Sequence, residues 1–346
     1  MVRLAGLDYS RAELLRKVGD ISQVGGVRRL TLADGPGKGM AVVQFRTGSG
    51  LSFTVLPDRG MDIGEAAWCG RPLAWRSAVG DVAPAFLEPQ GTGWLRSFGG
   101  GLLTTCGLTY NGAPCLDQGE PLGLHGRIGH APAESVWADG EWEGDRYRMW
   151  VRGRAREAAV FGAHVQLTRE ISAYLGEDRF TVTDVVENLG HRPVEHMLLY
   201  HINLGFPLVD AGSRLLLPPH PVRPRDEDAA AGLAAWDRFG EPDPAYREQV
   251  FYHDLAPGPD GTVTATVASP SGLGCYVQYQ AASLPRFVQW KMQGAGEYVL
   301  GLEPANCLPE GRARERERGT LQFLAPGERR EYRLEIGVTG SQVCDG

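Results

Sequence analysis

The sequence lacks the long apolar segments of membrane and exported proteins. No run in its 346 residues approaches the ~18 apolar residues of a membrane-spanning helix. The opening residues, Met-Val-Arg-Leu-Ala-Gly-Leu-Asp, contain no apolar core of signal-peptide length. We therefore expect a cytoplasmic protein that has no membrane partner.

Clustered cysteines are also missing. No Cys-x-x-Cys pair and no zinc-like spacing occurs among the six, which are Cys69, Cys106, Cys115, Cys275, Cys307 and Cys344. Because no secretion signal accompanies them, we expect reduced, partly buried thiols.

An uncompensated basic stripe, which a nucleic-acid interface requires, is absent as well. The formal net charge is −7, and in segment 312–318 arginines are interspersed with Glu315 and Glu317. We expect a small molecule as the partner and no nucleic acid. The oligomeric state is left open, with a homodimer as one option.

Glycine and proline are abundant instead, at 47 and 23 residues, without any repeat. They fit turns between many short strands. Polar and apolar residues alternate in several short runs separated by turn residues, which favours antiparallel sheets stacked as a large sandwich. The runs are 146–152, 165–171, 180–186, 262–267 and 275–279.

One helix is predicted near the start of the chain, with Ser10 as N-cap, Glu13 completing a capping box, and Gly19 at its end. We divide the chain into an N-terminal helical extension, 1–25, and a single β-sandwich catalytic domain, 26–346. The irregular stretch 218–244 is long for a connection within a domain and is expected to be functional or mobile, with a short helix over 229–236.

Three distant segments carry proton-handling side chains: His125 in Leu-His-Gly-Arg, His201 in Tyr-His-Ile-Asn-Leu-Gly, and Glu303 in Gly-Leu-Glu-Pro-Ala-Asn. Opening a sugar hemiacetal ring needs one group to accept a proton and another to donate one. Histidine and glutamate suit these roles because modest shifts bring the pKa of either near neutrality.

Simpler interpretations stay open for each residue. Glu303 precedes a proline expected to stop its strand and could form a surface salt bridge. His201 lies in an apolar run and could be a hydrogen-bonded core histidine. His130 is spaced to join His125 at a metal, whereas His196 should face away from His201.

Together the segments resemble the aldose 1-epimerase (galactose mutarotase-like) family. Residues 124–127 are similar to its Leu-His-Gly-Gly, whose histidine contacts the sugar, and 300–304 stand where it has its general base. Residues 200–205 resemble the segment of the general acid, although His201 matches only with a two-residue deletion. Residues 251–255 resemble a segment whose aspartate, here Asp254, holds sugar hydroxyls. Arg127 replaces a glycine, so the chain looks like a divergent branch.

The resemblance implies an all-β, galactose mutarotase-like antiparallel super-sandwich with a short N-terminal helix and a site in a cleft on a concave sheet face. It implies an isomerase, a carbohydrate C1 epimerase (mutarotase) that needs no cofactor and no metal. His201 would protonate the ring oxygen, Glu303 would remove the anomeric proton, and His125 would hold the sugar. The alternatives are a metal-dependent keto-sugar isomerase or lyase on the same scaffold, and a non-catalytic carbohydrate-binding protein.

The segments 57–64 and Trp290-Lys291-Met292 also look like features of this branch. Three cations, Arg59, Arg127 and Lys291, lie in or beside segments that the resemblance places at the cleft. They hint at an acidic or oxidised sugar as substrate. Trp236, in the irregular stretch, is expected to stack on the sugar ring.

Overall fold

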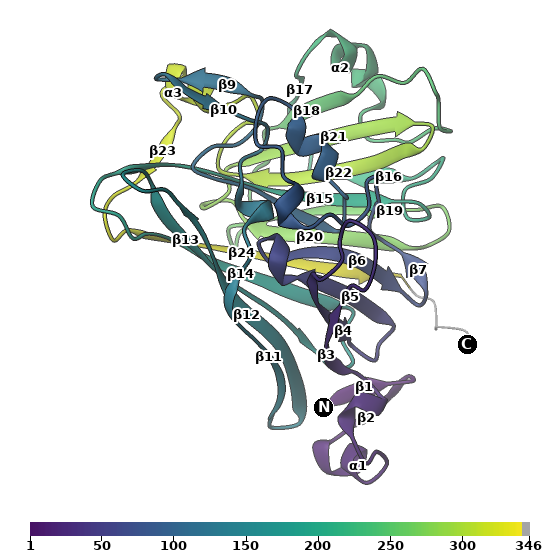
Figure 1. Cartoon of the computed structure of the whole chain (residues 1–346). Helices are drawn as coiled ribbons and strands as arrows, with labels where there is room; N and C mark the ends of the chain where they lie inside the picture. The colour runs from purple at the N-terminus through teal and green to yellow at the C-terminus, as the bar shows by residue number, and fades with distance from the viewer. Residues whose placement is uncertain (341–346) are drawn as a thin grey trace.

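Two large antiparallel sheets form most of the structure, a computed structural model that describes residues 1–340 (Figure 1). The 12-stranded sheet follows the order β17-β18-β21-β22-β15-β8-β6-β5-β4-β3, with β23 beside β15 and β7 beside β6. Its strands are β17 Val222–Pro224, β18 Gln249–His253, β21 Arg286–Gly294, β22 Glu297–Ala305, β15 Val194–Gly205, β8 Leu103–Leu108, β6 Asp62–Trp68, β5 Leu51–Leu56, β4 Ala41–Arg46, β3 Gly26–Thr31, β23 Gln322–Leu324 and β7 Arg71–Pro72.

The second sheet has eight strands in the order β11-β12-β13-β14-β24-β20-β19-β16. They are β11 Glu134–Glu143, β12 Arg146–Ala158, β13 His164–Tyr174, β14 Arg179–Asn188, β24 Arg329–Thr339, β20 Gly274–Gln280, β19 Thr262–Ala268 and β16 Arg214–Leu216. All five alternating runs of the sequence lie in strands of this sheet, so the predicted sandwich is confirmed.

The sheets pack face to face through one continuous apolar core. Phe53 of β5 and Phe180 of β14 meet across it, with ring centroids 4.3 Å apart. Strand β15 is buried on both faces: Leu198, Tyr200 and Ile202 belong to this core, whereas Leu199 belongs to a smaller cluster on the opposite face. An apolar strand that alternates between two buried layers explains why its sequence shows no polar face.

Helices are short. α1 (Arg11–Leu15) has the predicted capping box between Ser10 and Glu13 but ends before Gly19, and it follows the hairpin of β1 (Val2–Leu4) and β2 (Leu7–Tyr9) at the bottom of Figure 1. α2 (Glu227–Gly232) and a 3-10 turn, Leu233–Ala235, confirm the helix predicted in the irregular stretch. α3 (Arg312–Glu317) packs against the small hairpin of β9 (Cys115–Asp117) and β10 (Glu120–Leu122).

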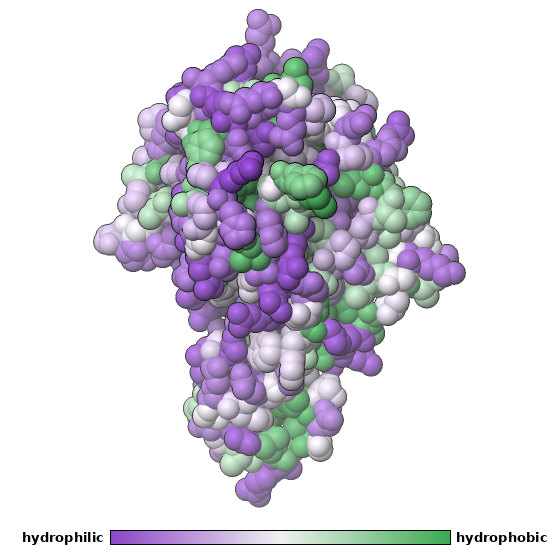
Figure 2. All heavy atoms as spheres, turned by 60° about the vertical axis from the view of Figure 1, so that its left-hand side comes forward, coloured by the Kyte–Doolittle hydropathy of each residue, from purple (hydrophilic) through white to green (hydrophobic). Residues whose placement is uncertain are grey.

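Two further observations concern the surface and the thiols. Hydrophilic residues predominate on the face in Figure 2, where hydrophobic residues form separate small patches. No helix within residues 1–340 is long and apolar enough to cross a membrane. Cys69 is disulfide-bonded, so the expectation that every thiol is reduced is wrong there, whereas Cys106, Cys115, Cys275 and Cys307 are free.

Candidate active site

His201 and Glu303 lie side by side on neighbouring strands. Ile202 of β15 pairs with Leu302 of β22, and both belong to the core between the sheets. Since successive side chains of a strand point to opposite faces, His201 and Glu303 share the other face. Nε2 of His201 is 3.3 Å from Oε1 of Glu303, and both side chains are buried. β22 continues through Pro304 to Ala305, so Glu303 is not at the strand end that the proline predicted.

Burial controls the charge of this pair. It raises the pKa of Glu303 to about 8, helped by the negative charge of Glu248. It lowers the pKa of His201 to about 3, helped by His125. At a pH between these two pKa values, the pair holds one proton, which is most stable on the carboxyl group of Glu303. Nδ1 of His201 is buried and has no hydrogen-bond partner among the described residues.

His125 completes the cluster from a tight loop. Its backbone is left-handed, with φ 57°, an uncommon conformation for a residue other than glycine that is found disproportionately at functional sites. Its ring centroid is 6.0 Å from that of His201, and its Nδ1 is 3.2 Å from Oδ1 of Asn111. Burial lowers the pKa of His125 to about 4, so the ring is neutral at physiological pH. A Cβ at Gly126 would lie 2.2 Å from the carbonyl oxygen of Gly107, so only glycine allows this close approach.

Aromatic rings surround the three groups. His201 is flanked by Phe98 and Trp290, whose ring centroids lie 5.5 and 5.2 Å away, and Trp94 lies 4.8 Å from His125. Trp290 is half-buried, and its indole N–H donates to Glu248 at 3.0 Å. Such a setting keeps water from the acid–base groups and offers flat apolar surface, to which the C–H faces of a sugar can pack.

Gly301 makes room for the pair. It lies two residues before Glu303 on the same face, and a Cβ there would be 3.0 Å from Oε1 of Glu303 and 3.2 Å from Cε1 of His201. A larger residue would press on both groups.

Lys291 and Trp236 do not line this site. Lys291 lies one position from Trp290 on β21 and points to the opposite face, where its ammonium donates to the carbonyls of Ala235 and Arg238 at 2.7 Å each. Burial lowers the pKa of Lys291 to about 8. Trp236 also packs on that opposite face, against His253 at 5.0 Å between ring centroids. The lysine therefore anchors the irregular stretch behind the sheet.

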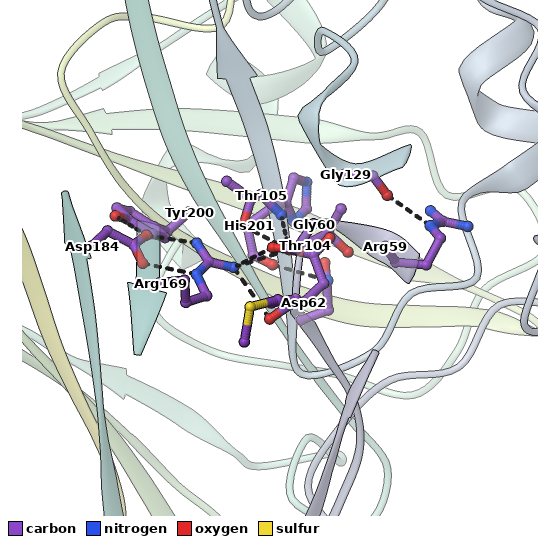
Figure 3. A network of polar contacts seen from close by, with 12 residues as sticks. Arg59, Gly60, Asp62, Thr104, Thr105, Gly129, Arg169, Asp184, Tyr200 and His201 are labelled. Carbon is purple, nitrogen blue, oxygen red and sulfur yellow. Dashed lines mark hydrogen bonds and ion pairs between the residues drawn. The ribbon is translucent and has the colours of Figure 1, made fainter. Parts of the chain in front are cut away.

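Arg59 is a structural residue as well. Its buried Nε donates to the carbonyl oxygen of Gly129 at 2.7 Å (Figure 3). Its Nη1 donates to the carbonyl oxygens of Val82 and Ser97 at 2.7 and 3.1 Å.

The other two predicted ligands lie at the surface. Arg127 is exposed and donates weakly to the hydroxyl of Tyr110 at 3.4 Å. It borders a neighbouring cavity of about 340 Å³ that also contacts Glu157. Asp254 is exposed and pairs with Arg223 at 3.4 Å. Neither has a hydrogen bond or ion pair with His201 or Glu303.

His196 and His130 make hydrogen bonds away from His201 and Glu303. His196 points to the core between the sheets, where Nε2 lies 2.6 Å from the hydroxyl of Tyr332, as its spacing from His201 predicts. His130 is 2.7 Å from Oγ of Ser97. Within residues 1–340, no three His, Cys, Asp or Glu side chains group closely enough to hold a metal ion.

A buried ionic network supports β15 from behind (Figure 3). Arg169 of β13 forms a two-pronged contact with Asp184 of β14, at 2.8 and 2.6 Å, and reaches Asp62 of β6 at 3.3 Å. The hydroxyl of Tyr200, next to His201, donates to Asp184 at 2.7 Å. Burial raises the pKa of Asp62 to about 6. The network thus joins both sheets directly behind the candidate acid.

Comparison with known proteins agrees with this fold. A provisionally named aldose 1-epimerase from Klebsiella pneumoniae has a TM-score of 0.87 and 27% identity, over 91% of this chain and 83% of that one. A galactose mutarotase-like protein from Clostridium acetobutylicum and galactose 1-epimerase from Lactobacillus acidophilus each have a TM-score of 0.61, over 92% of this chain and 100% of their own, at 13% and 12% identity.

The resemblance predicted from the three segments is therefore confirmed, and the fold is that of the galactose mutarotase-like proteins. No protein with a curated function matches the chain by sequence. Residues 37–338 match a family that is described only as a domain of unknown function, DUF4432. The chain belongs to this DUF4432 family.

Proposed function

We propose that the protein is a carbohydrate C1 epimerase that interconverts sugar anomers. The observation that carries the proposal is the buried contact of 3.3 Å between His201 and Glu303 beside a third imidazole, His125. A side chain positioned to transfer a proton in the transition state typically adds ~10²–10⁴-fold to a rate. The name of the relative from Klebsiella pneumoniae supports the same activity.

In the proposed reaction, the proton on the pair is donated to the ring oxygen, and the bond between C1 and that oxygen breaks. The electrons of the anomeric O–H bond form the C1 carbonyl, and its proton passes to the other member of the pair. We assign donation to His201 and acceptance to Glu303. Their close contact allows the resting proton to move from the carboxyl group to the imidazole first.

Rotation about the C1–C2 bond and closure by the reverse steps give the other anomer. The pair ends with the single proton with which it began, so no co-reactant is needed. His125, whose Nδ1–H donates to Oδ1 of Asn111, would accept a hydrogen bond from a sugar hydroxyl at Nε2, and Trp290 would stack against the ring.

The test is anomeric exchange measured by NMR on a panel of neutral and acidic aldoses, with and without a chelator. We expect exchange well above the buffer rate for at least one sugar, unchanged by the chelator. Activity lost to the chelator would favour the metal-dependent isomerase. Sugar binding without any exchange would favour a non-catalytic binding protein.

A further inference from the structure

Arg286 is a half-buried arginine that has no hydrogen bond and no ion pair with any residue in the described range 1–340. It begins β21 and pairs with Ala305 of β22, whereas Glu303 pairs with Val288. Arg286 and Ala305 therefore share the face of Glu303, and Arg286 is the diagonal neighbour of Glu303. Such neighbours lie about 7–8 Å apart, within reach of a long side chain.

A second observation links Arg286 to the surroundings of His125. Its charge acts on the thiol of Cys307, whose Sγ accepts a hydrogen bond from Asn111 at 3.5 Å. Asn111 in turn contacts His125. Cys307 and Asn111 thus connect Arg286 to His125, the third imidazole of the site.

Three other arginines, Arg223, Arg225 and Arg318, each form an ion pair with a carboxylate. Arg225 pairs with Glu248 at 2.8 Å, Arg223 pairs with Asp254, and Arg318 pairs with Glu310. Each of these carboxylates already has a cation, so Arg286 contributes one uncompensated positive charge. A cation that has no protein partner can bind an anionic ligand without first breaking an ion pair.

We propose that Arg286 binds a carboxylate on the substrate, so that the preferred sugars are uronic acids. The guanidinium fork matches a carboxylate in shape and can donate two parallel hydrogen bonds. A phosphate would bring nearly two negative charges, whereas the site offers one unpaired cation. This substrate class replaces the assignment of acid recognition to Arg59, Arg127 and Lys291, whose side chains are engaged elsewhere or exposed. The proposal that uronic acids are turned over rests on the proposed epimerase activity, whereas the proposal that Arg286 binds their carboxylate does not.

Binding can be tested separately from turnover with methyl glycosides, whose blocked anomeric oxygen prevents ring opening. The probes are methyl glucuronoside and methyl galacturonoside, each compared with its neutral methyl glycoside by calorimetric titration. We expect at least one acid to bind about 10-fold or more tightly than its neutral partner. Arg286→Gln should weaken that acid by about 10- to 100-fold and the neutral glycoside by less than about 3-fold.

Two further variants serve as controls for an effect on folding rather than on binding. Arg286→Lys keeps the charge and should retain part of the preference. Arg247→Gln, at an exposed arginine paired with Asp228, should leave all affinities unchanged. Equal binding of acid and neutral sugars, binding of neither, or an unaffected Arg286→Gln protein with native thermal unfolding would overturn the inference.

Anomeric exchange then separates this inference from the proposed function. If glucuronate or galacturonate is turned over, Arg286→Gln should raise its KM with little change in kcat. Charge-dependent binding without any exchange would contradict the epimerase and leave the role of Arg286 standing. Exchange of neutral and acidic sugars at equal rates in the parent and in Arg286→Gln would support the epimerase and overturn the role of Arg286.

Discussion

At the scale of single residues, the site is defined by how many protons His201 and Glu303 hold. Burial raises the pKa of the carboxyl group and lowers that of the imidazole, because both charged forms lose water. The pair therefore carries one proton over a broad range of pH. Two protons would leave no acceptor, and no proton would leave no donor.

This proton count predicts the pH profile. Since the raised pKa of Glu303 is about 8, the pair keeps its proton below that value and loses it as pH rises through it. The value of kcat/KM should be flat between about pH 5 and 7 and then fall by up to about 10-fold per pH unit above 8. Exchange rates corrected for buffer catalysis measure it. A rate that rises through pH 8 to a plateau would show that the unprotonated pair is the active form.

At the scale of elements, strand alternation decides which residues reach the site. The motif Trp290-Lys291-Met292 drew attention to its lysine, yet the lysine faces the anchoring stretch and the tryptophan faces His201. Counting alternation from Glu303 across the β21–β22 pairing would have identified Trp290, but that register depends on a pairing partner that the sequence does not display. Nothing in the sequence marked Asn111 as a site residue, because it contacts His125 only once the loop has folded.

The role of Lys291 as an anchor can be tested. Lys291→Met leaves the carbonyls of Ala235 and Arg238 without their donor, so we expect a loss of about 1–3 kcal/mol in the free energy of unfolding. KM should change little because the side chain is on the face opposite Glu303. Urea unfolding and exchange kinetics measure the two effects, with the exposed Lys38→Met as a control. A large rise in KM at unchanged stability would place the lysine in the site.

Much of the fold was predictable from local pattern. Alternating runs such as 180–186 became strands, and Ser10 with Glu13 capped α1 as expected. The three segments with His125, His201 and Glu303 also meet, as their resemblance to the mutarotases implied. Arg59 was assigned to the site because it is close in sequence to a matched segment, but its guanidinium is satisfied by backbone carbonyls. Such contacts arise only after the loops have packed.

At the scale of the whole molecule, the network of Arg169, Asp184 and Asp62 ties the two sheets together behind β15. A buried cation between two buried carboxylates tolerates no loss of one partner, since the remaining charges would be left without compensation. The same network fixes Tyr200 and hence the adjacent His201.

Removal of this cation should be severe. Arg169→Leu is expected to lower the free energy of unfolding by about 3–5 kcal/mol, because two carboxylates lose their partner in the interior. Arg152→Leu, at an exposed position of the adjacent strand β12, should stay within about 0.5 kcal/mol of the parent. Chemical denaturation of both variants provides the comparison. A loss below about 1 kcal/mol for Arg169→Leu would mean that the network contributes little to joining the sheets.

The most direct test of the central claim is the rate of anomeric exchange in Glu303→Gln. The amide keeps the shape of the neutral carboxyl group that burial favours but cannot pass a proton between sugar and imidazole. For the best substrate of the parent protein, we predict that kcat falls at least ~10²-fold while the affinity for its methyl glycoside stays within a few-fold. A variant that folds, binds and still exchanges anomers at nearly the parent rate would contradict the assignment of catalysis to Glu303 and His201.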